Sequence, residues 1–122
     1  MIKRLHSSLF FVENINTTKD FYKNVGFSVE GDDTTLRIVL GDFRLAFMLD
    51  GAGEIEVNAK GKERGVGMFT YIEVNDVDEH YKTLVNKGIS TSSEPKNWPW
   101  GKREYAVKDP DGYALVFYSP VK

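Results

Sequence analysis

Two segments of this chain repeat the same pattern 62 positions apart. The first, "VENINTTKDFYKNVGFSVE", begins at Val12, and the second, "VNDVDEHYKTLVNKGISTSSE", begins at Val74. The pairs that keep this offset are Val12 and Val74, Asn14 and Asp76, Ile15 and Val77, Asn24 and Asn86, and Gly26 and Gly88. Many strand–helix–glycine units look alike, but a register shared over this length indicates an internal duplication.

Each half predicts a strand followed by a helix. Alternating segments, "LHSSLFFV" and "GMFTYIEV", precede the helices and are typical of strands. Side-chain oxygens of Asn16-Thr17-Thr18 and of Asn75-Asp76 can cap the first helical turns. Gly26 and Gly88 suit the left-handed position that ends a helix. The helices are expected over 17–25 and 76–87.

The second helix predicts one apolar stripe and one polar side. The stripe consists of Val77, Tyr81, Leu84 and Val85. His80 is expected on the polar side, as an ordinary helix residue.

Three further strands are expected in each half. In the first half they are "FSVEG", "TTLRIVLGD" and "FRLAFMLD", and in the second "ISTSS", "KREYAVKD" and "YALVFYS". The prediction is an α+β fold made of two β-α-β-β-β modules, which form curved mixed sheets around a cleft. Module one covers about 1–50, a polar, glycine-rich linker about 51–65, and module two about 66–122.

Composition excludes several classes of function. A chain of 122 residues with 41% hydrophobic residues forms one globular domain, 1–122. A net charge of −2 without a basic stripe argues against nucleic acid, and the apolar runs are too short to span a membrane. Cysteine is absent, which removes disulfides and thiolate chemistry and favours a cytoplasmic location.

The stretch "PWGKREYAVKDPDGYALVFY" carries the most specific signal. Proline and Gly112 in "DPDG" suit a type I turn followed by a bulge that restarts a strand. With the duplicated β-α-β-β-β plan, this stretch resembles the vicinal oxygen chelate superfamily, which includes glyoxalase I, extradiol dioxygenases and the fosfomycin and bleomycin resistance proteins. The resemblance covers nearly the whole chain and is nearest to bleomycin-resistance-like members. It implies a homodimer.

The resemblance also implies where metal-using members place their ligands. Two positions lie five residues before Val12 and Val74, and two lie in the last strand of each module. Here these positions hold Ser7, Phe69, Ala46 and Val116. None of the four is a useful ligand for a divalent ion, so neither a metal nor another cofactor is expected.

Catalysis by the remaining groups is not supported by the sequence. His6 is one residue from a ligand position, and strand alternation is expected to point it away from the cleft. Ser7 and Ser8 lack a glycine-rich elbow and a neighbouring base, so a hydrolytic triad is not indicated. No catalytic residue is assigned.

Binding is the function that the residue pattern favours. Strand alternation predicts that Leu9 and Glu73 face the cleft together with the residues at the four metal-ligand positions. The cleft is then an apolar, aromatic-lined cavity, the usual composition of a small-molecule pocket. Trp98 and Trp100 offer flat surfaces for stacking, and Arg103 is expected at the same rim. The predicted ligand-binding residues are Ser7, Phe11, Ala46, Met48, Phe69, Tyr71, Trp98, Trp100, Arg103 and Val116. The alternative is that these side chains fill the space, and that the tryptophans anchor a loop or a dimer contact.

The sequence therefore predicts a metal-independent protein that sequesters a small aromatic or amphipathic molecule, in the manner of antibiotic resistance proteins. Bleomycin itself is disfavoured, because 18 acidic residues barely exceed 16 basic ones. The alternative function is a glyoxalase-like lyase or isomerase acting on a small substrate. A purely structural module is a third interpretation, if side chains seal the cleft.

Overall fold

The computed structural model describes residues 1–53, 59 and 61–122. The chain forms two compact units, Met1–Lys62 and Glu63–Lys122, and each is described by itself. The expected linker at about 51–65 falls partly outside the described residues.

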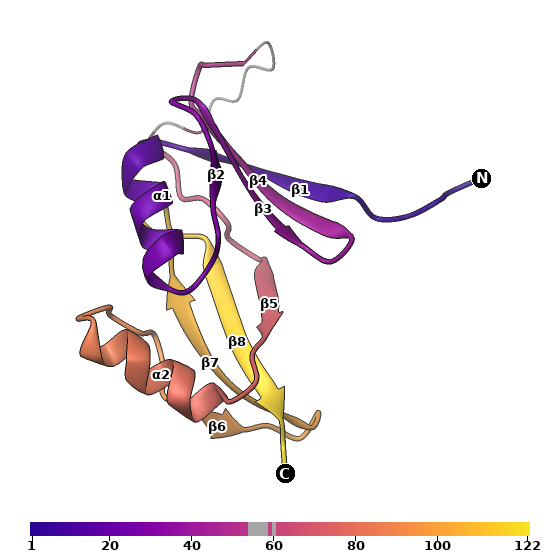
Figure 1. The fold of residues 1–122 in the computed structure, drawn as a ribbon, viewed down its shortest axis with the longest axis vertical. Helices are drawn as coiled ribbons and strands as arrows, with labels where there is room; N and C mark the ends of the chain where they lie inside the picture. The colour runs from indigo at the N-terminus through magenta and orange to yellow at the C-terminus, as the bar shows by residue number, and fades with distance from the viewer. Residues whose placement is uncertain (54–58, 60) are drawn as a thin grey trace. The chain divides into compact units, whose positions relative to one another are not determined.

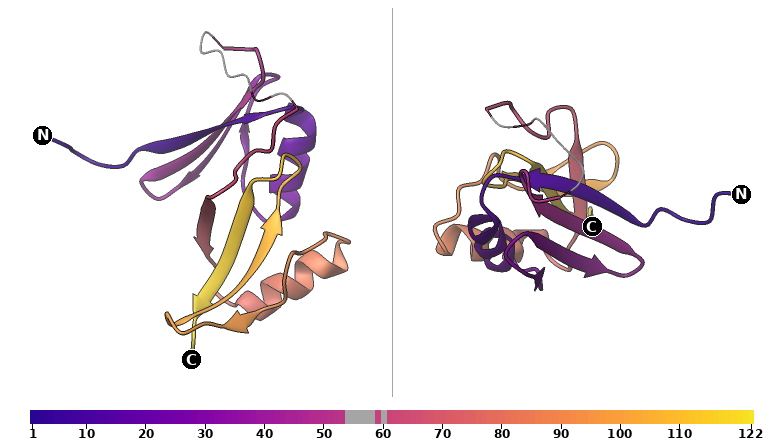
Figure 2. Two further views of the ribbon diagram at one scale, coloured as in Figure 1. Left: turned by 180° about the vertical axis from the view of Figure 1, so that it is seen from behind. Right: turned by 90° about the horizontal axis from the view of Figure 1, so that it is seen from above.

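The first unit is a four-stranded mixed sheet with one helix (Figure 1). Its elements are β1 (Ser7–Val12), α1 (Ile15–Asn24), β2 (Glu30–Gly31), β3 (Thr35–Leu40) and β4 (Phe43–Leu49). The strand order is β1-β4-β3-β2, with β1 parallel to β4 and the other pairs antiparallel. The residues before β1 leave the sheet as an extended, exposed arm (Figures 1 and 2).

The second unit repeats this topology. Its elements are β5 (Phe69–Glu73), α2 (Val77–Asn86), β6 (Lys96–Asn97), β7 (Lys102–Lys108) and β8 (Ala114–Pro120). The order is β5-β8-β7-β6, and β5 is parallel to β8. The register is also repeated, because Leu9 pairs with Ala46 as Tyr71 pairs with Val116. The predicted α+β fold of duplicated β-α-β-β-β modules is confirmed.

Each helix has an asparagine or aspartate as its N-cap and is followed by a glycine. Asn14 is the N-cap of α1, because its Oδ1 accepts from the Thr17 amide at 3.0 Å. The helix therefore begins at Ile15, earlier than the predicted 17, and Asn16-Thr17-Thr18 is not its cap. Thr18 is fully buried instead. In α2 the predicted cap Asp76 accepts from the Asp78 and Glu79 amides. Gly26 and Gly88 follow the helices with positive φ, as predicted.

The core of each unit lies between its helix and one face of its sheet. In the first unit, the Tyr22 ring of α1 lies 4.6 Å from the Phe47 ring of β4. In the second, Leu84 of α2 is fully buried, but Val85 is 46% exposed and does not belong to the stripe. Packing of these apolar side chains is the main force that holds each helix against its sheet.

His80 lies on the inner side of α2, which corrects its predicted position. Its ring centroid is 4.4 Å from that of Phe117, and its Nδ1 lies within hydrogen-bond distance of the Tyr105 hydroxyl. A ring with apolar faces and a hydrogen-bonding nitrogen fits this half-buried position. His80 therefore supports the helix–sheet packing.

Two hairpins of the second unit use one turn design. In "WPWG" the Gly101 amide donates to the Trp98 carbonyl at 3.1 Å, and the Trp98 amide to the Lys102 carbonyl at 2.9 Å. In "DPDG" the Gly112 amide donates to the Asp109 carbonyl at 3.0 Å, and the Asp109 amide to the Tyr113 carbonyl at 2.9 Å. Each turn has proline second and a glycine at positive φ fourth, as a type I turn with a following bulge requires.

Arg64 and Gly65, at the end of the predicted linker, pack against the second of these turns. Arg64 and Asp111 form a buried ion pair at 3.6 Å. A Cβ on Gly65 would lie 2.7 Å from Cδ1 of Tyr113, so only glycine fits this close approach. The buried Asp109 carboxylate accepts from the Asp111 and Tyr113 amides, each at 2.9 Å.

The strand expected at "ISTSS" is absent, and β6 lies at Lys96–Asn97 instead. The Ser92 amide donates to the Ala106 carbonyl, but the Ala106 amide donates to Oγ of Ser93. A side chain thus takes the place of a main-chain carbonyl, and the ladder does not continue. Within the described residues, no helix is long and apolar enough to cross a membrane.

Candidate functional site

The open face of the first sheet, opposite α1, carries four of the predicted binding residues. Paired strands β1 and β4 place Leu9 beside Ala46 and Phe11 beside Met48, while Ser7 pairs with Arg44. Phe11 is largely buried and Leu9 is 44% exposed. The face is apolar along most of β1 and β4, and it becomes polar at Ser7.

His6 lies beside Ser7 rather than turned away from it. Nη1 of Arg44 lies 3.1 Å from His6 Nε2, and His6 Nδ1 lies 3.1 Å from Ser7 Oγ. The alternation argument fails here because β1 begins at Ser7, so His6 precedes the strand. His6, Ser7 and Arg44 thus form one exposed hydrogen-bonded group at the start of β1.

The second unit contains a hollow of about 290 Å³ on the open face of its sheet. We call it the aromatic hollow, lined by Phe69, Tyr71, Ser93, Trp98, Trp100, Glu104, Tyr105, Ala106 and Val116. Its walls come from β5, β7, β8, the turn that joins β6 to β7, and Ser93, which precedes β6. The predicted binding residues Phe69, Tyr71, Trp98, Trp100 and Val116 are therefore brought together within one unit.

The turn positions both tryptophans. Their ring centroids lie 4.8 Å apart with planes 9° from parallel. Nζ of Lys96 lies 4.3 Å from the Trp98 ring centroid, which adds a cation–π contact. Trp100 is 54% exposed, so a large part of its ring is accessible.

Glu104 is a buried carboxylate at the wall of the aromatic hollow. Its Oε1 accepts from the Tyr71 hydroxyl at 3.1 Å, and its Oε2 accepts from Nε1 of Trp100 at 3.3 Å. Burial raises the pKa of the Tyr71 hydroxyl, and the Glu104 hydrogen bond and charge raise it further. Tyr71 therefore remains a neutral donor at physiological pH.

A more open hollow adjoins the first and shares Tyr71 and Trp100 with it. Its other lining residues are Lys102 and Tyr118. Nζ of Lys102 lies 5.1 Å from the Tyr118 ring centroid. The Tyr118 hydroxyl donates to Oε1 of Glu73 at 3.1 Å, so Tyr118 is oriented much as Tyr71 is.

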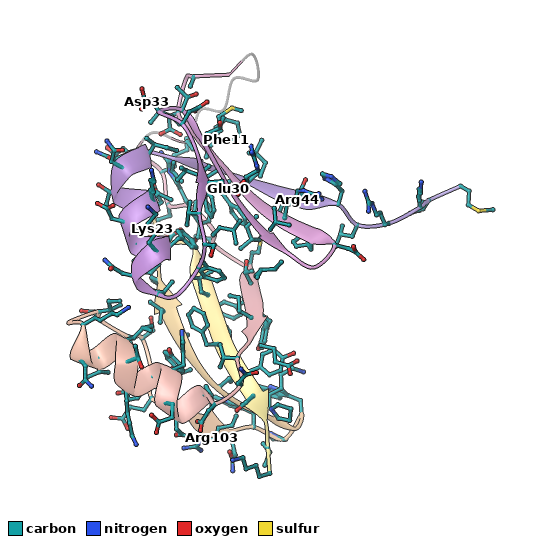
Figure 3. All side chains as sticks on the ribbon, in the orientation of Figure 1. Phe11, Lys23, Glu30, Asp33, Arg44 and Arg103 are labelled. Carbon is teal, nitrogen blue, oxygen red and sulfur yellow. The ribbon has the colours of Figure 1, made fainter. Side chains whose placement is uncertain are left out.

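Arg103 lies apart from the aromatic hollow, at the start of α2 (Figure 3). Its Nε and Nη2 donate to the two carboxylate oxygens of Asp78, each at 3.0 Å, and its Nη1 donates to Asn97. Strand alternation explains the difference, because Lys102, Glu104 and Ala106 share the open face while Arg103 points toward α2. The rim position expected for Arg103 is not observed.

Sequence reasoning missed Glu104. The signal that identifies it was present, since Glu104 is two residues from Ala106, whose strand partner is Val116. Alternation along "KREYAV" places Glu104 and its neighbour Arg103 on opposite faces of the sheet. Charged residues are rarely buried unless they are paired, so a glutamate on the face of Ala106 and Val116 is a candidate site residue.

The four positions that the family resemblance assigns to metal ligands carry no anionic or imidazole side chain. Ser7 and Ala46 lie on the first sheet, and Phe69 and Val116 on the second. A serine hydroxyl is the sole polar side chain among them, and a divalent ion needs several anionic or imidazole ligands. Within the described residues, no group of three or more His, Cys, Asp or Glu side chains is arranged to hold a metal ion.

Known structures share this fold over nearly the whole chain. A member of the glyoxalase/bleomycin resistance protein/dioxygenase superfamily from Sphaerobacter thermophilus is 25% identical, covers 96% of this chain and 97% of its own, and has a TM-score of 0.72. TioX from Micromonospora sp. ML1 is 20% identical, with coverages of 98% and 100% and a TM-score of 0.75. A virulence protein from Salmonella typhimurium is 21% identical, with coverages of 99% and 99% and a TM-score of 0.75.

Sequence comparison agrees with the duplicated topology. Comparison with curated proteins gives no match. The family model described as the Glyoxalase/Bleomycin resistance protein/Dioxygenase superfamily matches residues 4–117. The chain therefore belongs to the glyoxalase/bleomycin resistance protein/dioxygenase superfamily.

Proposed function

We propose that this protein binds a small planar aromatic or amphipathic molecule in the aromatic hollow, without a metal, and sequesters it. The observation that carries the proposal is the hollow itself, which is walled by Tyr71, Trp98 and Trp100 around the buried Glu104. A mostly apolar concavity with a few polar groups is the usual composition of a small-molecule site.

Pre-orientation of Trp100 supports this assignment. Its ring stacks on Trp98, its indole N–H is bonded to Glu104, and Pro99 and Gly101 fix the backbone on either side. A ring that is already held loses little entropy when a ligand stacks on it. The accessible area of Trp100 is the surface on which such a ligand would lie.

The four ligand-equivalent positions favour binding over metal-assisted chemistry. Ser7, Ala46, Phe69 and Val116 offer no ligand set that would polarise a substrate oxygen. Sequestration needs no reaction, and it would protect a cell by lowering the free concentration of a toxic aromatic compound. We therefore favour a resistance-type role over a glyoxalase-like enzyme.

We also propose that the protein is a homodimer. Large apolar side chains on the open faces of both sheets are exposed, including Leu9 at 44%, Val39 at 49% and Phe69 at 67%. Exposed apolar side chains that gather on a sheet face are commonly covered by a partner. Sedimentation velocity at micromolar concentration is expected to give a dimer, and a monomer at these concentrations contradicts this proposal.

Tryptophan fluorescence tests the binding proposal directly. Both tryptophans line the hollow, so a bound planar ligand is expected to quench or shift their emission with a saturable isotherm. The Trp100→Ala variant retains Trp98 as a reporter and is expected to bind more weakly. A flat response to a varied panel of planar ligands would contradict the proposed function.

A further inference from the structure

We propose that Glu104 makes the aromatic hollow selective for aromatic cations, that is, for flat ring systems that carry a positively charged nitrogen. This inference rests on the proposed function, because it names the ligand class of the same site. The reasoning begins with the bonding state of the Glu104 carboxylate.

The carboxylate of Glu104 has neutral partners alone in the part of the chain that the structure describes. The Tyr71 hydroxyl and the Trp100 indole N–H each occupy one oxygen, and no lysine, arginine or histidine forms an ion pair with it. A carboxylate accepts about four hydrogen bonds, so about two acceptor sites remain. Burial of a carboxylate costs free energy unless a cation pairs with it, so a cationic partner would stabilise Glu104.

Glu104 and its two hydrogen-bond donors all line the hollow. Both donors, Tyr71 and Trp100, are themselves wall residues, and Glu104 is a wall residue between them. A ligand that stacks on the accessible part of Trp100 therefore lies next to the carboxylate. A charged N–H placed there forms a charge-assisted hydrogen bond, which is about twice as strong as a neutral one.

The surrounding rings favour a cation as well. Aromatic faces attract positive charge, and this unit uses that attraction twice, with Lys96 over Trp98 and Lys102 over Tyr118. Among the described residues, no lysine or arginine covers Tyr71 or Trp100 in this way. These two rings border the hollow, so they are available to a cationic ring system.

A set of three planar probes with different charges tests the inference. Fluorescence or calorimetric titration is carried out with 9-aminoacridine, a cation at pH 7, with the neutral ring system acridone, and with the anion anthracene-9-carboxylate. The wild-type protein is expected to bind 9-aminoacridine at least about tenfold more tightly than acridone, as one charge-assisted contact allows. The anion is expected to bind least well.

The substitution Glu104→Gln separates charge from shape. It is expected to remove the preference for 9-aminoacridine over acridone while acridone affinity changes by less than about threefold. The matched control is Glu79→Gln, which removes the same charge from an exposed residue of α2 and is expected to leave the preference intact. If Glu104→Gln does not fold, the salt dependence of the wild type replaces it. The preference should then fall between about 20 mM and about 0.5 M salt, because screening weakens the ionic contact.

The outcomes are distinguishable. Equal affinity for 9-aminoacridine and acridone, or equal loss of both in Glu104→Gln, overturns the inference and leaves the proposed function standing. A preference that disappears equally in Glu79→Gln also overturns it, because net charge is then the cause. Failure of all three probes to bind contradicts the proposed function and this inference together.

Discussion

The indole rings of Trp98 and Trp100 stack 4.8 Å apart across Pro99, with planes only 9° from parallel. Residues one and three of a turn rarely present two large rings to each other unless the backbone between them is fixed. Here proline fixes φ at the second position and Gly101 adopts a φ of 84° at the fourth. The stack is thus a property of the turn and needs no ligand to form.

Removal of one ring of this stack is expected to affect binding and not folding. Trp100→Ala should weaken ligand affinity by about 1–3 kcal/mol, the value for one large apolar contact. The urea midpoint should change little, because Trp100 is 54% exposed and the third turn position accepts most residues. If the variant unfolds while affinity per folded molecule is unchanged, Trp100 is a structural anchor.

Substitution in the second turn should have the opposite effect. Gly112→Val is expected to lower the free energy of unfolding by about 1–3 kcal/mol, because φ is 96° there and a β-branched residue tolerates positive φ poorly. Gly112→Asn is the control and should cost less, since asparagine enters this region more readily. Urea unfolding measures both, and equal losses would argue against backbone strain as the cause.

The core face of α2 can be tested with two neighbouring residues. Leu84→Ala is expected to cost about 2–5 kcal/mol in unfolding free energy, because Leu84 is fully buried and leaves a cavity. Val85→Ala should cost less than about 0.5 kcal/mol, because Val85 is 46% exposed. Comparable losses in chemical denaturation would show that Val85 is covered in solution, for instance in a dimer.

The Asp78–Arg103 pair predicts a dependence of stability on pH. The Arg103 hydrogen bond lowers the pKa of Asp78 below its ordinary 3.8. Because the folded carboxyl has the lower pKa, the pair stabilises the fold above about pH 4, and this contribution is lost as the pH falls through the folded value. Asp78→Asn should therefore reduce stability at pH 7, by less than about 1 kcal/mol since both side chains are partly exposed, and not at about pH 2.

The control for this pair lies one residue away. Glu79 pairs with Lys82 at 3.5 Å, and both side chains are largely exposed. Glu79→Gln should leave the unfolding free energy nearly unchanged across the same pH range. A loss as large as that of Asp78→Asn would point to a general effect of charge at the start of α2.

Metal removal is expected to have no effect. Elemental analysis of the purified protein should give far less than one equivalent of Zn, Ni, Fe or Mn, because the four ligand-equivalent positions lack suitable donors. Treatment with a chelator should leave thermal stability and ligand affinity unchanged. One full equivalent of any of these metals would overturn the strand alignment that assigns Ser7, Ala46, Phe69 and Val116 to those positions.

The topology was predictable because duplication makes each module a check on the other. The 62-residue offset fixed strand, helix and glycine together, and the pairing of Leu9 with Ala46 and of Tyr71 with Val116 confirms the alignment. The failures are local. At "ISTSS" the alternation favoured a strand, but Oγ of Ser93 accepts the Ala106 amide and interrupts the ladder.

The apolar lining of the aromatic hollow was predictable from the sequence, and its polar lining was not. Alternation along the strand predicted that Phe69 and Tyr71 share a face, and both line the aromatic hollow together with the two tryptophans. The charged residue was assigned by proximity in sequence, which favoured Arg103, although adjacent strand residues face opposite sides of the sheet. The ion pair joins Arg103 to Asp78 of α2, which is distant in sequence, so no local sequence pattern predicts it.

The two turns have the same backbone but different side chains at their first and third positions. In one turn the first and third positions hold Trp98 and Trp100, and in the other the same positions hold Asp109 and Asp111. Proline, glycine and main-chain hydrogen bonds define both loops, so side chains as different as indoles and carboxylates occupy one backbone. Positions 98 and 100 are therefore a natural place to randomise in a library, where ligand preference can be evolved while the hairpin that displays it is inherited unchanged.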